Sequence, residues 1–306
     1  MIHPKFEQVR GIENNALLEL GKQSGYIWNL FSRIKTNSNG RVNILRFFHL
    51  LAKQWTVNNY HTGLHAKPVM KNGMLNPDLH PSMVEMVHSI LDTAEEHNMW
   101  ILLDVTNRSA AQAMGIKPSD FHNDKWLREA HLPFIENALT EFEQHKNIIW
   151  ETCNESATGD YRWEVKIAEK LKKHGAKFVT ASPLKAGVRK ILISLKSAID
   201  FVCIHGLWMA DWDADWNRYK EFGTKVWFSG DGKSELTGGK ASRWCQFGEE
   251  KYGKLPSPGW HKRLIQLMAV RNNGVSHNMS GALEVKEPKW AYFDQCCKEY
   301  VNGFKL

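Results

Sequence analysis

The sequence lacks the features that identify a membrane protein or a protein with an intact secretion signal. Its 306 residues contain no run of eighteen apolar residues, and the N-terminal segment MIHPKFEQVR lacks the apolar core of a signal peptide. We therefore expect a soluble globular protein without a membrane partner. The chain as written predicts a cytoplasmic location, or an extracellular one if a leader has been removed.

Cysteine is scarce and odd in number. The chain has five cysteines, of which Cys153 and Cys203 lie inside apparent strands and Cys296 and Cys297 are adjacent. This pattern indicates buried free thiols rather than a disulfide framework. Neither CxxC nor HExxH spacing occurs, so the sequence predicts no metal site.

A strong imbalance of charge is also missing. The formal net charge is +7, and the lysines are dispersed over apparent helix faces, as in AEKLKKHGAK at residues 168–177. Dispersed lysines are typical of a solvated surface, whereas a nucleic-acid binder gathers them on one face. We expect no nucleic-acid partner.

Short β-rich runs alternate along the chain with amphipathic helical stretches. The eight runs lie at residues 6–10, 42–48, 100–105, 147–152, 177–182, 200–205, 225–230 and 274–279. Helical patterns lie between them, for example at residues 81–98, 127–146, 161–175 and 259–274, and several end in the glycine or asparagine that favours helix termination.

Eight repeats of strand and helix, with strands apolar on both faces, predict an α/β fold of the (β/α)8 TIM-barrel type. No GxGxxG turn follows an early strand, which argues against a doubly wound sheet. The first strand is polar, and residues 12–40 must supply the whole first helix. We expect one domain over residues 1–306, with loop insertions at about 51–81 and 231–258.

In such barrels the chemistry lies at the carboxyl ends of the strands. Polar residues that follow an apolar run are therefore candidates for the site. They are Arg46, Asp104, Asn107, Glu155, Ser182, His205, Trp208, Ser229, Asp231, His277 and Asn278.

The segment NIIWETCNESATG, residues 147–159, contains the most informative of these strand ends. Its core IIWETCNES resembles the fourth-strand signature of clan A glycoside hydrolases, the superfamily of cellulase-like and family-five-like retaining barrels. RVNILRFF is similar to the second strand with its inward arginine, and DFVCIHG to the sixth strand with its histidine. The resemblance extends over nearly the whole chain.

The resemblance implies roles for the strand-four pair. Glu155 would protonate the leaving glycosidic oxygen and then deprotonate water, and Asn154 would hydrogen-bond the sugar 2-hydroxyl. No cofactor is implied, because two carboxyl groups perform the reaction between them. The alternative is that the pair only caps the next helix or faces solvent in a loop.

The seventh strand departs from the family pattern. A context like VWISEFG is expected there, but the chain has VWFSGDGKSE, which puts Gly230 at the glutamate position. Asp231 can serve as nucleophile if a local irregularity turns it inward, which glycines at 230 and 232 make easy. Alternatively Glu235 takes the role, or the nucleophile has been lost by divergence or engineering.

Further side chains are predicted to bind substrate. Arg46 can pair with the nucleophile, or it is an ordinary buried arginine, and His205 can bond the nucleophile or a sugar hydroxyl. Trp208 and Trp212 are spaced by four in GLWMADWDADW and offer flat faces for sugar rings. Asn107 completes the substrate-binding set.

The sequence thus predicts a glycosidase that acts on a poly- or oligosaccharide. Retention requires carboxyl groups roughly 5 Å apart, and inversion about 6.5 to 9.5 Å. The main alternative is a carbohydrate-binding barrel without a nucleophile. A metal-dependent barrel hydrolase is disfavoured because the first strand has no His-x-His. The sugar, the linkage and the oligomeric state are not encoded in a form that we can recognise.

Overall fold

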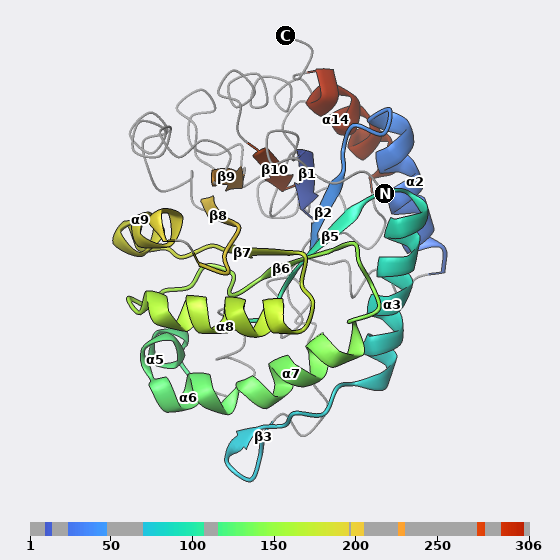
Figure 1. The fold of residues 1–306 in the computed structure, drawn as a ribbon. Coiled ribbons are helices and arrows are strands. Elements are labelled where there is room, and N and C mark those ends of the chain that lie inside the picture. Colours follow the sequence, from blue (N-terminus) through green and yellow to red (C-terminus); the bar gives the residue numbers. More distant parts are fainter. Residues whose placement is uncertain are drawn as a thin grey trace.

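The computed structural model describes residues 10–13, 24–47, 70–106, 116–195, 197–204, 226–229, 274–278 and 289–302. Eight parallel strands form a closed barrel, and the described helices lie around its outside (Figure 1). This confirms the predicted α/β barrel. The order around the ring is β1-β10-β9-β8-β7-β6-β5-β2.

The barrel strands agree closely with the predicted runs. They are β1 (Arg10–Glu13), β2 (Ile44–Phe47), β5 (Trp100–Asp104), β6 (Ile148–Glu151), β7 (Phe178–Ala181), β8 (Phe201–Ile204), β9 (Val226–Ser229) and β10 (Gly274–Asn278). All residues of β5, β6, β7 and β8 are buried. Burial on both faces explains why these strands lack polar alternation.

The first strand differs from the prediction. The run at 6–10 was expected to form it, whereas the described strand is Arg10–Glu13 and shares only one residue with that run. Its sequence, RGIE, has no apolar pattern that would distinguish it from a loop. Pairing with β2 and β10 on both sides determines this strand, because a closed barrel leaves no unpaired edge.

Alternate residues of each strand belong to two different cores. The barrel interior is filled by a cluster of large side chains: Ile44, Trp100, Leu102, Ile149, Phe178, Phe201 and Cys203. The intervening residues, such as Leu45, Ile101 and Trp150, pack in a larger cluster with the helices. The two-residue period of a strand produces this division.

The described helices are α2 (Tyr26–Asn37), α3 (Pro81–Glu96), α5 (Pro118–Asn123), α6 (Lys125–Ala130), α7 (Leu132–Glu141), α8 (Tyr161–Lys173), α9 (Ala186–Ser194) and α14 (Trp290–Asn302). The stretches predicted at 81–98 and 161–175 correspond to α3 and α8, and α2 falls within residues 12–40, where the first helix was expected. Asn98 and Gly175 have φ values of 57° and 85° just after α3 and α8. Both adopt the left-handed conformation expected for residues that terminate helices. The helix predicted at 259–274 lies outside the described residues, apart from Gly274 in β10.

The helix predicted at 127–146 is wrong in its continuity. The chain forms α6 and then α7, and His131 is the junction between them. Pro133 is the second residue of α7. A proline is accepted in the first turn of a helix but lacks the N–H that a continuous helix would need.

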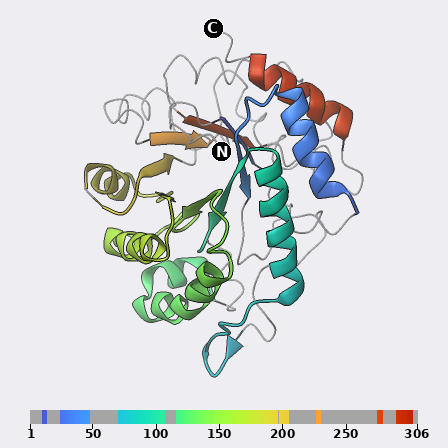
Figure 2. The ribbon, with the colours of Figure 1, turned by 45° about the vertical axis from the view of Figure 1, so that its right-hand side comes forward.

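The last described helix, α14, lies beside the first described one, α2. Figure 2 shows α14 next to α2, which in turn lies near α3. Arg33 of α2 and Asp294 of α14 form an ion pair at 2.5 Å. The Tyr300 hydroxyl donates to the Gly11 carbonyl at 2.9 Å, so α14 also fixes β1.

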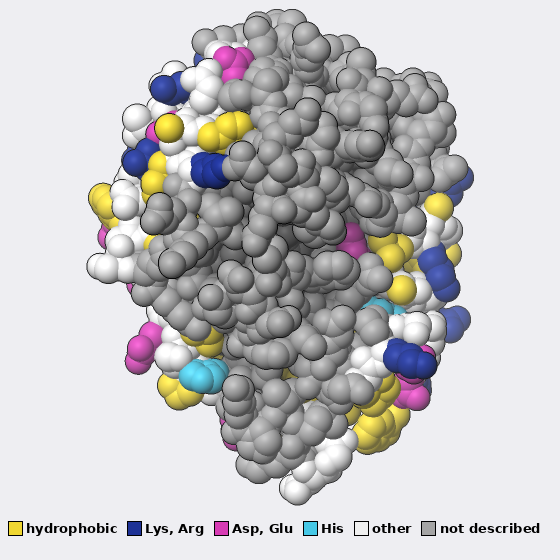
Figure 3. All heavy atoms as spheres, turned by 180° about the vertical axis from the view of Figure 1, so that it is seen from behind, with side chains coloured by type: hydrophobic (Ala, Val, Ile, Leu, Met, Phe, Trp, Pro, Cys, Tyr) yellow, Lys and Arg dark blue, Asp and Glu magenta, His cyan; other side chains and the backbone are white. Residues whose placement is uncertain are grey.

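The described surface is mixed in charge. On the face in Figure 3, Lys and Arg side chains are spread around the rim with Asp and Glu between them. Lys166 and Lys172 pair with Glu129 and Asp200 at 2.6 and 2.7 Å. Within the described ranges, no helix is both long and apolar enough to cross a membrane.

One of the two expected insertions is partly described. The hairpin of β3 (Met70–Lys71) and β4 (Met74–Leu75) falls within residues 51–81 and projects below the barrel in Figure 1. Leu75 is buried in the outer core, which fixes the base of the hairpin. The second insertion, at 231–258, lies outside the described residues.

Candidate active site

The candidate site begins where β6 ends at Glu151. The Asn154 amide donates to the Thr106 carbonyl, after β5, at 2.8 Å. The Leu184 amide, after β7, donates to the Ser156 carbonyl, also at 2.8 Å. The segment beyond β6 is therefore held from both neighbouring strand ends, at the edge where barrels place their chemistry.

Glu155 has an unusual backbone conformation. Its φ is 53°, in the left-handed region that residues other than glycine rarely adopt. The Glu155 amide donates to Ser182 Oγ at 3.0 Å, and the Ser182 hydroxyl donates to the Cys153 carbonyl at 3.0 Å. Strain of this kind costs about 1–3 kcal/mol and clusters at functional sites. Buried Ser182 stabilises it here.

A buried ion pair lies beside Asn154. One Nη of Arg46 donates to both carboxylate oxygens of Glu151, at 2.8 and 3.0 Å. The same nitrogen donates to Asn154 Oδ1 at 3.0 Å. Asp104, also buried, is the register partner of Glu151. A guanidinium and two carboxyl groups therefore lie at the carboxyl ends of β2, β5 and β6.

The contact with Arg46 fixes the orientation of the Asn154 amide. A guanidinium only donates hydrogen bonds, so the carbonyl oxygen of Asn154 must face it. The amide NH2 group then points elsewhere with two N–H donors. This orientation suits a ligand that offers hydroxyl oxygens.

A third buried carboxyl lies behind the end of β6. Thr152 Oγ1 donates to Glu164 Oε2, and both residues are fully buried. Burial raises the pKa of Glu164 to about 7. The hydrogen bond from Thr152 and the nearby Ser156 hydroxyl lower the pKa of Glu164 again, as does the charge of Arg128, whereas the charge of Glu151 raises it further.

Cys153 lies between these groups but is not a nucleophile. Burial raises the pKa of its thiol well above the usual range, and the charges of Glu164, Asp104 and Glu151 raise it further. Such a thiol stays protonated and unreactive. Among the described residues, no group of three or more His, Cys, Asp and Glu side chains is arranged to hold a metal ion.

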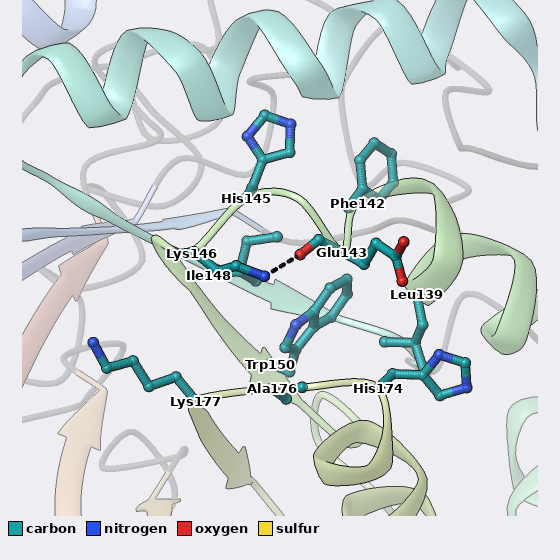
Figure 4. A pocket seen from close by; sticks show the side chains of 11 residues that line it. Leu139, Phe142, Glu143, His145, Lys146, Ile148, Trp150, His174, Ala176 and Lys177 are labelled. Carbon is teal, nitrogen blue, oxygen red and sulfur yellow. Dashed lines mark hydrogen bonds between the residues drawn. The ribbon is translucent and has the colours of Figure 1, made fainter.

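A small pocket at the other end of the barrel is separate from this site. It lies where β6 and β7 begin, between Ile148 and Lys177, and Trp150 contributes to its lining (Figure 4). His145, His174 and Lys177 point in different directions there. The amino ends of the strands serve stability in this fold, so the pocket is not a candidate for catalysis.

The geometry agrees with a sequence-family match. The family described as "Cellulase (glycosyl hydrolase family 5)" matches residues 36–190, about half of the chain. This range contains Arg46, Glu151, Asn154 and Glu155. The chain belongs to glycosyl hydrolase family 5. The protein is therefore a glycosidase with a carbohydrate substrate, which confirms the resemblance seen in IIWETCNES.

Solved structures share the family 5 barrel. A glycoside hydrolase family 5 mannosidase from Rhizomucor miehei superposes with a TM-score of 0.59 at 15% identity, over 97% of this chain and 93% of that chain. A broad-specificity endoglucanase from Clostridium acetobutylicum gives 0.58 at 11% identity, over 98% and 100%. These similarities show the fold alone. No curated protein sequence matches the chain.

The described part of this glycosidase contains three of the eight residues that were predicted to be catalytic or to bind substrate. Arg46 and Asn154 contact each other, and Glu155 follows Asn154 directly. Arg46 was expected to pair with the nucleophile or with backbone carbonyls, and its described bonds are to Glu151 and Asn154. The other predicted residues lie outside the described residues: Asn107, His205, Trp208, Trp212 and Asp231.

Three acidic residues near the candidate site were not predicted from the sequence. Glu151 ends an apolar run, and the complementary Arg46 ends another, which was a usable signal for a buried pair. Glu164 lies on the buried face of α8 with Ile167 and Leu171, where an apolar residue is expected, and this exception to the amphipathic pattern was also a usable signal. Glu13, the register partner of Arg46, went unnoticed because the first strand was placed too early.

Proposed function

We propose that this glycosidase cleaves O-glycosidic bonds of a poly- or oligosaccharide with retention of configuration, and that Glu155 is its general acid and base. The main support is the position of Asn154 and Glu155 at the carboxyl end of β6, next to the buried Arg46–Glu151 pair. The proposal treats residues 1–306 as one catalytic domain.

The proposed reaction has two displacements. A carboxylate attacks the anomeric carbon while the glycosidic C–O bond breaks and Glu155 donates its proton to the departing oxygen. A glycosyl ester forms. Glu155, now ionised, takes a proton from water as that water attacks the same carbon, and the ester bond breaks. Two inversions give net retention.

Asn154 is proposed to bind the sugar 2-hydroxyl. Its amide NH2 points away from Arg46 and can donate to a hydroxyl oxygen without adding charge. Arg46 is fully buried, so its part in substrate binding is proposed to be indirect, through Asn154. Asn107, His205, Trp208 and Trp212 remain proposed contacts to the sugar.

Asp231 is the proposed nucleophile. In the register of β9, position 227 lies beside Cys203 of β8, which belongs to the interior cluster. Positions along a strand alternate between its two faces, so position 229 is also an interior position. If the strand continued regularly, position 231 would be an interior position too, and no bulge would be needed to turn Asp231 toward the barrel. Asp231 itself lies outside the described residues.

A carbohydrate-binding barrel without catalysis is the second candidate. It is favoured by one observation, namely Gly230 at the position where the family pattern has a glutamate. It predicts saturable sugar binding and no turnover. Glu235, four residues after Asp231, is the remaining alternative as nucleophile.

The test is a panel of manno- and gluco-oligosaccharides and their 2,4-dinitrophenyl glycosides, because the similar structures include a mannosidase and an endoglucanase. Wild type is compared with Glu155→Ala, Asp231→Ala and Glu235→Ala in the presence of azide. Azide can replace the missing carboxyl group in either step.

The azide products distinguish the two roles. If Glu155 is the acid and base, its variant with an activated substrate gives a glycosyl azide of retained configuration. If Asp231 is the nucleophile, its variant gives the inverted azide. Inverted product from Glu235→Ala would transfer the role to Glu235. Binding without turnover by wild type would establish the second candidate.

A further inference from the structure

Glu164 has no place in the two displacements, yet it is a fully buried carboxyl close to the site. It lies in α8, and its carboxyl reaches the end of β6 through the Thr152 hydroxyl. An apolar residue would fill this position on the buried face of α8 at lower cost, since a buried carboxyl loses hydration that its neighbours only partly replace.

Two residues close to Glu164 flank the proposed catalytic pair. Thr152 lies two residues before Asn154, and Ser156 directly follows Glu155. Thr152 donates a hydrogen bond to the Glu164 carboxyl, whereas the Ser156 hydroxyl lowers the pKa of Glu164 without a hydrogen bond of ordinary geometry to it. The Glu164 carboxyl is therefore bonded to the residue that leads into the turn in which Glu155 adopts its left-handed conformation.

The start of α8 is itself firmly attached. Asp160 caps the helix by accepting from the Arg162 amide at 3.1 Å. Arg128 of α6 donates to Thr158 Oγ1 at 3.1 Å and to Asp160 at 3.4 Å. Glu164, one turn further along, is thus carried by a fixed helix rather than by a loop.

We infer that Glu164 is a positioning residue for the proposed general acid and base, and that it acts through its hydrogen bond with Thr152, at the start of the segment that carries Glu155. The inference rests on the proposed role of Glu155. The charged and titratable groups around Glu164 are Glu151 of β6, Cys153 and Arg128 of α6.

The variants separate the hydrogen bond from the charge. Glu164→Leu removes the bond with Thr152 at similar volume, whereas Glu164→Gln keeps an acceptor for the Thr152 hydroxyl. Thr152→Val removes the same bond without changing α8, and Thr152→Ser restores it. Glu169→Leu, at an exposed position of the same helix, is the matched control.

The first measurement does not depend on activity. Hydrogen exchange of the peptide that spans 152–157 is followed in the native state by mass spectrometry. Glu164→Leu and Thr152→Val should speed exchange about tenfold or more, while Glu164→Gln, Thr152→Ser and Glu169→Leu should not. Unchanged exchange in both of the first two variants would overturn the inference.

The second measurement links the turn to acid catalysis. Departure of 2,4-dinitrophenol needs little protonation, whereas departure of phenol needs much more. Glu164→Leu and Thr152→Val should lower kcat/KM about a hundredfold for phenyl glycosides and at most about threefold for dinitrophenyl glycosides. Equal losses of kcat/KM for the two substrates would show that Glu164 has a purely structural role and would overturn the inference.

Failure of the proposed function has a different signature. If Glu155→Gln itself shows no dependence on the leaving group, Glu155 is not the general acid, and the fault lies with the proposed function. If Glu155→Gln shows the dependence and the Glu164 and Thr152 variants do not, only the inference about Glu164 fails.

Discussion

Glu164 should make the stability of the barrel depend on pH in a direction opposite to that of most carboxyl groups. Its pKa is about 7 in the folded protein and 4.5 as an ordinary exposed glutamate, and burial is the main cause. Between these values the folded state binds more protons than the unfolded state, so stability falls as pH rises.

The magnitude follows from the two pKa values. Each pH unit between them corresponds to 1.36 kcal/mol, so a rise from 4.5 to about 7 corresponds to about 3 kcal/mol. This stability is fully present below pH 4.5, is lost as pH rises to about 7, and does not change further above that. Glu164→Gln should remove this dependence.

The assay compares thermal midpoints of wild type and Glu164→Gln between about pH 4 and about pH 8. The variant should gain on wild type by about 3 kcal/mol across the range, roughly 6 °C for a chain of this size. Other titrating groups cancel in the comparison. Glu169→Gln, an exposed change of equal charge on α8, should give a constant difference.

A difference between wild type and Glu164→Gln that does not vary with pH would refute the reasoning. It would mean that the carboxyl group has the same pKa in the folded and unfolded chains, and hence that water reaches it. A gap that closes rather than widens with rising pH would reverse the sign and imply a carboxylate stabilised by Arg128.

Three further predictions concern neighbouring residues. Glu151→Gln should destabilise the fold by about 3–5 kcal/mol because it removes the carboxylate that is paired with the buried Arg46 charge; a loss below about 1 kcal/mol in thermal unfolding would contradict this. Ser182→Ala should lower kcat about tenfold with KM nearly unchanged, since it releases the Glu155 amide; a rise in KM alone would point to substrate binding. Native protein should react with a thiol reagent at no more than one cysteine, Cys245, because the described thiols are buried: Cys153, Cys203, Cys296 and Cys297.

The barrel was predictable because its strands are covered on both faces. Phe201–Ile204 is buried throughout, so its sequence is a continuous apolar run that ends abruptly in polar residues. The strand Arg10–Glu13 has no such run. Its inner register positions are 11 and 13, a glycine and a glutamate, so only pairing with β2 and β10 identifies it.

The site was predictable only in part. Asn154 and Glu155 were predictable because they are polar residues just beyond the end of an apolar strand. The two runs indicate that Arg46 and Glu151 are buried charges, but they do not show that these two residues meet, because β5 lies between their strands and only the stagger of the closed ring brings them level. Sequence alternation gives the face of a residue but not its height.

The side chains inside the barrel change from apolar to charged along the strands. Ile44, Leu102 and Ile149 belong to a purely apolar cluster, whereas two residues later the same strands present Arg46, Asp104 and Glu151. The apolar layer keeps water from the charged one, and this strengthens the bond from Arg46 to Asn154. The strained turn at Glu155 therefore follows a strand end whose side chains are buried and paired. The packing of these side chains takes no part in the reaction, but it offsets the free-energy cost of the left-handed backbone at Glu155.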